Sequence, residues 1–105
     1  MRRTVRPLEN PLDWVFYNPS HVAVLRALRD SREGMSGRAA ARLAGGNHQA
    51  CAEALRKLED VGVVRRQGSG RTQLIRLNFE HYLVREILLP LLRKEREFLA
   101  QIRRD

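Results

Sequence analysis

Hydrophobic residues recur at helical intervals in three consecutive segments and predict three short helices. In the first, Val22, Leu25 and Leu28 lie on one face. Either Asn18 or Ser20 caps this helix, because both side chains can accept a hydrogen bond from a free backbone amide of the first turn. We therefore expect an amphipathic helix that packs on the core along one face.

A glycine pair separates the second helix from the third. Gly45 and Gly46 supply the left-handed conformation that a sharp turn after a helix requires. Ser36 before the second helix and Asn47 before the third are typical caps, so each helix has its own start signal. The residues of the second helix that we expect to face inward are Ala40, Leu43 and Ala44. Two capped helices joined by so short a turn predict a helix-turn-helix.

The third helix has one buried and one outward face. Cys51, Leu55 and Leu58 recur at intervals of four and three residues and predict the buried face. In a helix-turn-helix, the first residues of this helix enter the major groove of DNA and meet the base edges. The base contacts that we predict are His48, Gln49, Glu53 and Arg56. The alternatives are a solvated position for Glu53, and a phosphate contact or a solvated position for Arg56.

A short antiparallel ribbon follows the third helix. Residues 63–66 and 72–77 favour strands, and residues 67–71 between them have the composition of a hairpin loop. A ribbon directly after a helix-turn-helix is how a winged helix-turn-helix is arranged. We therefore predict a mostly α fold with a small β-ribbon, in which the winged domain spans residues 20–78.

The segments on either side of this domain carry many apolar residues. Residues 1–19 predict an irregular or briefly helical N-terminal arm, and residues 79–105 a C-terminal helical segment with a kink or break near Leu89 caused by Pro90. A helix that is apolar nearly all round requires neighbours on two sides. We therefore expect these flanks to form a dimer interface. Its predicted residues are Trp14, Phe16, Tyr82, Leu83, Ile87, Leu88, Leu91, Leu92 and Phe98.

The charge of the chain indicates a polyanionic partner. The formal net charge is +8, and the excess lies in residues 35–76, which hold eight basic and three acidic side chains. The predicted contacts to the DNA backbone are Ser36, Arg38, Asn47, Lys57, Arg65, Arg66, Ser69 and Arg71. Two alternatives remain: Gly68-Ser69-Gly70 is only a tight turn with exposed charges, or the abundance of arginine reflects a GC-rich genome.

Catalytic, metal and membrane functions have little support in the sequence. A strand follows Gly68-Ser69-Gly70, whereas a phosphate-binding loop requires a Gly-Lys-Ser/Thr ending and a helix. Cys51 and the three histidines, His21, His48 and His81, do not have the spacing of metal ligands. A single cysteine suits a reducing compartment, and neither a membrane-spanning run nor a secretion signal is present. We therefore expect a cytoplasmic protein that is not an enzyme and needs no cofactor or metal.

Most of the chain resembles a known family of regulators. Residues 24–28, 36–38, 42–45, 54–59, 62–64 and 76–78, with His81, resemble winged helix-turn-helix transcriptional regulators of the MarR/ArsR-like kind. Residues 6–8, 83–85 and 88–91 extend the resemblance to a bacterial and archaeal subgroup often fused to, or encoded beside, a nucleotidyltransferase domain. The chain has no Gly-Ser turn followed by paired aspartates after residue 78, so the resemblance implies no transferase activity.

Together these patterns predict a homodimeric, sequence-specific regulator that binds double-stranded DNA. Two-fold pairing would place the recognition helices about 34 Å apart on a pseudo-palindromic site. The alternative is an adaptor that docks a partner protein, such as a nucleotidyltransferase, through residues 79–104, because a fold does not fix a function.

Overall fold

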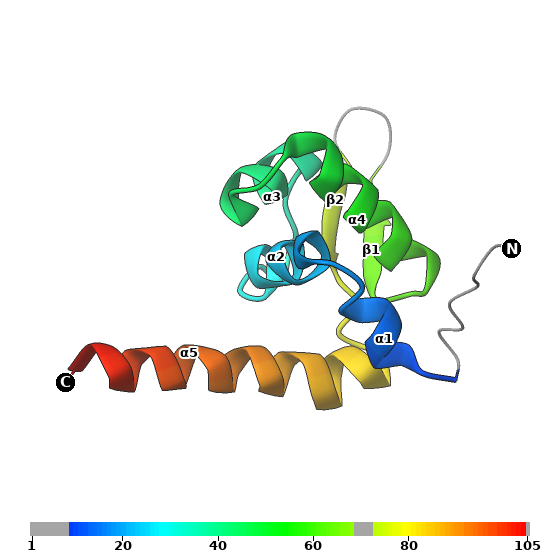
Figure 1. The fold of residues 1–105 in the computed structure, drawn as a ribbon. Coiled ribbons are helices and arrows are strands. Elements are labelled where there is room, and N and C mark those ends of the chain that lie inside the picture. The colour runs from blue at the N-terminus through cyan, green and yellow to red at the C-terminus, as the bar shows by residue number, and fades with distance from the viewer. Residues whose placement is uncertain (1–8, 69–72, 105) are drawn as a thin grey trace, which may run out of the picture.

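Helices and one small sheet surround a single hydrophobic core in the computed structural model of the chain, which describes residues 9–68 and 73–104 (Figure 1). The elements are α1 (Pro11–Val15), α2 (Pro19–Leu28), α3 (Gly37–Ala44), α4 (His48–Asp60), β1 (Val64–Gln67), β2 (Leu74–Leu77), the π-helical segment η1 (Leu83–Leu88) and α5 (Leu89–Arg104). The predicted class, mostly α with a small β-ribbon, is confirmed. None of the helices within the described ranges is long and apolar enough to cross a membrane.

The helix starts follow the predicted capping signals. The Asn18 side chain accepts a hydrogen bond from the His21 amide at 3.1 Å, so Asn18, not Ser20, caps α2. The Ser36 hydroxyl accepts from the Ala39 amide at 3.0 Å at the start of α3. These side chains satisfy backbone donors that would otherwise lack a partner inside the helix.

The core differs from the prediction on α2 and α3. On α2 the buried face is formed by His21, Val24, Leu25 and Leu28, while the predicted Val22 is only partly buried. The prediction that Leu43 faces inward is wrong, because 65% of this residue is exposed. The prediction for Ala40 is confirmed, and Ala41, which was not predicted, is also buried. The side of α3 that carries these two alanines packs on α2 and α4, and Leu43 lies outside that contact.

A third, shorter segment pairs with the two-stranded sheet. β1 and β2 pair antiparallel, with Val64 opposite Leu77. Met35, just before α3, adds an isolated bridge to Ile75, with N···O distances of 2.9 and 2.7 Å. The preceding Gly34 has a φ of 95°, and a Cβ at this position would lie 2.7 Å from the Ile75 carbonyl oxygen. Glycine therefore allows the chain to pass close enough for this bridge.

The predicted break at Pro90 is absent. Figure 1 shows a continuous helix through this region, and η1 passes directly into α5 at Leu89. The Leu89 amide donates to the Val84 carbonyl, five residues earlier, which is the pattern of a π-helix. The next residue, Pro90, has no amide hydrogen to place, and the wider π-helical turn before it leaves room for its ring. A local change of helix type therefore replaces the break.

Candidate nucleic-acid interface

The turn between α3 and α4 sets the direction of α4. Gly45 ends α3 in the left-handed conformation, with a φ of 74°, as the glycine pair predicts. Asn47 then caps α4 by accepting a hydrogen bond from the Ala50 amide at 2.9 Å. α4 buries Cys51, Ala54, Leu55 and Leu58 against the core. This fixes which face of α4 remains available to a partner.

The four predicted base-contact residues lie together on the outward face of α4. His48, Gln49, Glu53 and Arg56 are all exposed. Glu53 and Arg56 are joined by an ion pair one helical turn apart, with a distance of 3.4 Å between Arg56 Nη2 and Glu53 Oε2. His48 and Gln49 have no such partner in the described ranges. The first turn of α4 is therefore the part of the helix with free polar side chains.

The neighbouring helix α3 carries two exposed cations. Arg38 and Arg42 are separated by one helical turn and both are exposed. Neither side chain has an ion pair or hydrogen bond with a described residue. Arg38 was predicted as a backbone contact, but Arg42 was not. Its spacing of four residues from Arg38 is the sequence signal that places both on one side of α3.

The predicted cations of the ribbon have partners within the chain. Arg65 lies 3.7 Å from Glu80, and Arg66 donates to Glu59 at 3.1 Å. The free positive charge of the ribbon is therefore smaller than its composition suggests. Ser69 and Arg71, the predicted contacts at the tip, lie outside the described residues.

Lys57 and His21 lie close together where α4 meets α2. The Lys57 ammonium lies 5.0 Å from the centre of the Tyr17 ring, and Tyr17 also packs beside His21. His21 is fully buried, and backbone groups of Val15 and Trp14 are its polar neighbours. Burial, with a smaller contribution from the charge of Lys57, lowers the pKa of His21. The ring is therefore held in its neutral form, and Lys57 is less free to contact DNA than predicted.

The predicted dimer interface requires a correction. Leu83, Leu88 and Leu92 are at most 8% exposed and belong to the core of the single chain, because this face of η1 and α5 packs on the other elements. They therefore cannot supply much area to a second copy. The remaining predicted residues are Trp14, which is partly buried, and Phe16, Tyr82, Ile87, Leu91 and Phe98, which are exposed.

Apart from Phe16, these remaining residues form two groups. Trp14, Tyr82 and Ile87 line an apolar groove of about 660 Å³ between α1, the end of α4 and η1. Leu91 and Phe98 are separated by seven residues on the outer side of α5 and are 48% and 61% exposed. Ile102, which was not predicted, is 51% exposed and follows Phe98 by four residues. This spacing places the three on one stripe along α5.

Comparison of the chain with protein-family models, with curated proteins and with solved structures found no significant match.

Proposed function

We propose that the chain is a winged helix-turn-helix regulator that binds double-stranded DNA in a sequence-specific manner. In this proposal α4 is the recognition helix, α3 lies across the backbone, and the ribbon of β1 and β2 is the wing. The observation that carries it is that His48 and Gln49 on α4, and Arg38 and Arg42 on the neighbouring helix α3, are exposed and have no side-chain partner among the described residues. The resemblance to MarR/ArsR-like regulators points the same way, and such a regulator would act in the cytoplasm.

The roles of the residues follow from their partners. Gln49 can form two hydrogen bonds to adenine, whereas Arg38 and Arg42 suit phosphate oxygens, which carry no sequence information. Glu53 and Arg56 form an ion pair, so neither side chain is available to contact a base until DNA or solvent separates the pair. Arg65 and Arg66 would have to leave Glu80 and Glu59 to contact phosphate, which makes them weaker contributors than α3.

Fluorescence anisotropy with duplex DNA tests the proposal. Replacing both Arg38 and Arg42 with Gln should lower the affinity at least about tenfold and reduce the slope of log K against log salt by about 2. The control is the double variant R103Q/R104Q, which removes the same charge from the end of α5. No binding at low salt, or equal losses in both double variants, would contradict the proposal.

Sequence specificity needs a separate measurement. A selection of bound sequences from random DNA should yield a preferred site for the unmodified chain. Replacing Gln49 with Ala should weaken that preference at one or two positions by about 1–3 kcal/mol per base pair while leaving non-specific binding nearly unchanged. A selection that enriches no sequence would reduce the proposal to non-specific binding.

We further propose that the regulator is a homodimer formed through the stripe of Leu91, Phe98 and Ile102 on α5. The exposed stripe also fits a second candidate function, an adaptor that docks a partner protein such as a nucleotidyltransferase through α5. Light scattering of the full chain separates the two: a stable dimer that F98E converts to monomers supports the regulator, and a monomer supports the adaptor.

A further inference from the structure

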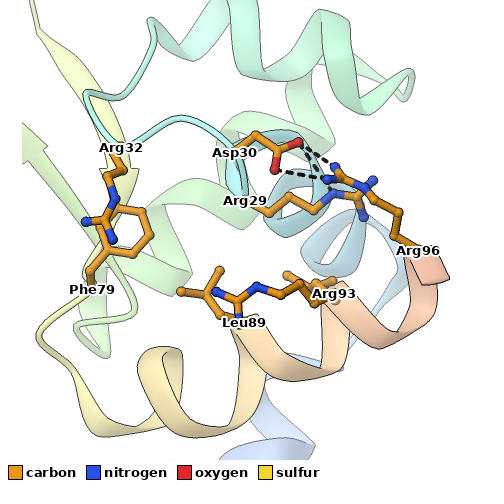
Figure 2. A pocket seen from close by; sticks show the side chains of 8 residues that line it. Arg29, Asp30, Arg32, Phe79, Leu89, Arg93 and Arg96 are labelled. Atoms are coloured by element: carbon orange, nitrogen blue, oxygen red, sulfur yellow. Dashed lines mark hydrogen bonds and ion pairs between the residues drawn. The ribbon is translucent and has the colours of Figure 1, made fainter.

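A cavity of about 230 Å³ lies between the end of α2 and the first turns of α5, and we call it the arginine pocket (Figure 2). The charged residues of its lining are Arg29, Asp30, Arg32, Arg93 and Arg96. Phe79 and two leucines of α5 supply the apolar part of the wall. Four cations therefore surround one carboxylate in a small space, which favours an anionic ligand.

The carboxylates nearest to the pocket are already engaged. Asp30 accepts hydrogen bonds from both terminal nitrogens of Arg96, and the Nη1–Oδ1 distance is 3.2 Å. Glu95 accepts from Arg26 Nε at 2.8 Å and lies 3.8 Å from Arg29 Nη1. These pairs also hold α5 against the end of α2, so the wall of the pocket is fixed on both sides.

Two arginines of the pocket, Arg32 and Arg93, have no hydrogen-bond acceptor or ion-pair partner among the described residues. The Arg32 guanidinium lies 5.0 Å from the centre of the Phe79 ring, and its side chain has no hydrogen bond or ion pair within the described ranges. The Arg93 side chain has no polar or ring contact with any described residue. Arg29 is already paired, because its Nε lies 4.0 Å from Asp30 Oδ2 and its Nη1 lies 3.8 Å from Glu95 Oε1. In Figure 2, Arg32 lies at one end of the pocket, Arg29 lies at the other, and Arg93 belongs to α5.

We propose that the arginine pocket binds the phosphate group of a small phosphate monoester. A phosphate monoester has three terminal oxygens, which suit the several donors of Arg32 and Arg93, the two guanidinium groups of the lining that have no polar partner among the described residues. A carboxylate offers only two oxygens in one plane. Guanidinium groups bind phosphate oxygens through two parallel hydrogen bonds, and these charge-assisted bonds are stronger than neutral ones. The ester group must be small, because the cavity is below the range of about 300–1,000 Å³ typical of drug-sized ligands.

This ligand would connect two parts of the chain. Arg32 belongs to the loop after α2, whereas Arg93 belongs to α5. A phosphate bound by both therefore reinforces the docking of α5 and raises the melting temperature of the chain. The site does not depend on the proposed DNA binding, since none of its residues lies on α3 or α4.

Isothermal titration calorimetry of the full chain with phenyl phosphate, in a low-salt buffer without phosphate, tests the proposal. One ligand should bind per chain, and R93Q should weaken binding at least about tenfold. R93K, which keeps the charge but loses the planar guanidinium group, should be intermediate. R103Q is the matched control, because it removes the same charge from the same helix outside the pocket.

Three results would overturn the proposal. The first is the absence of binding by both phenyl phosphate and inorganic phosphate. The second is an equal effect of R93Q and R103Q, which would mean a general response to charge. The third is weaker duplex DNA binding by R93Q without any binding of phenyl phosphate, which would make Arg93 a DNA-backbone contact. Circular dichroism of each variant establishes that the fold is retained.

Discussion

Arg26 of α2 and Glu95 of α5 form an ion pair with two contacts, with 2.8 Å between Nε and Oε1 and 2.5 Å between Nη2 and Oε2. The hydrogen bonds from Arg26 lower the pKa of Glu95 and keep it charged. Sixty-nine positions separate the two residues, so the pair joins distant parts of the chain. Together with the pair of Arg96 and Asp30, it joins α5 to the end of α2 beside the buried contacts of Leu88 and Leu92.

A double-mutant cycle with R26Q and E95Q should give a coupling energy of about 0.5–1 kcal/mol, since both side chains are partly exposed and solvent screens the pair. Urea unfolding measures it as a shift in midpoint at an unchanged m-value. The exposed pair of Lys94 and Glu97, one turn apart on α5 at 3.3 Å, is the control and should couple more weakly. Strictly additive effects of R26Q and E95Q would show that the pair does not hold α5.

Replacing Gly34 should lower the free energy of unfolding more than replacing any other glycine. A Cβ on Gly34 would meet the Ile75 carbonyl oxygen at 2.7 Å, so G34A must displace the bridge between Met35 and Ile75. We expect a loss of about 3 kcal/mol or more, from the left-handed backbone and the disturbed hydrogen bonds. G45A has the backbone cost alone, because nothing lies within 4 Å of its Cβ, and should lose about 1–2 kcal/mol. Equal losses in urea unfolding would refute this explanation.

His21 should make the fold less stable as the pH falls below neutrality. Its pKa is lowered by burial, so the unfolded chain binds more protons than the folded chain between the folded pKa and the ordinary value of 6.5. The stability that His21 contributes is therefore present above that value and is lost as the pH falls. H21L should reduce this dependence between about pH 7.5 and 5.5, whereas H48Q, at an exposed histidine, should keep it.

The titration of the carboxylates does not overlap the pH range in which His21 affects stability. The hydrogen bonds from Arg96 and Arg26 lower the pKa values of Asp30 and Glu95, respectively. Their contribution to stability is therefore lost only as the pH falls below the ordinary carboxyl range near about 4. A free energy of unfolding that stays constant from neutrality to about pH 5.5 would contradict the assignment to His21.

Local signals in the sequence predicted the helix starts and the turn. Ser36, Asn47 and Gly45 act within one helical turn of themselves, so neighbouring residues are enough to identify them. The prediction for Leu43 was wrong because its exposure depends on which side of α3 meets α2 and α4, and that side carries Ala40 and Ala41. Periodicity alone does not contain that information.

For the charged residues as well, the composition could be predicted from the sequence but the contacts in the fold could not. The sequence located the excess of arginine, but the partners of Arg65 and Arg66 become visible only in the folded chain. Leu83 and Leu88 were predicted for a dimer interface because the segment is apolar nearly all round. The single chain buries one side of it, and this leaves the outer stripe of α5 for a partner.

The ion pair between Glu53 and Arg56 makes a prediction specific to the proposed recognition face. E53Q removes a negative charge beside the DNA and releases Arg56, so non-specific binding to duplex DNA should become about three- to tenfold tighter, with a salt slope steeper by about 1. E97Q is a close control, because Glu97 forms an exposed pair with Lys94 at the same helical spacing on α5. Fluorescence anisotropy over a salt series measures both variants. If E97Q strengthened binding as much as E53Q, net charge alone would explain the effect and α4 would have no special part in binding.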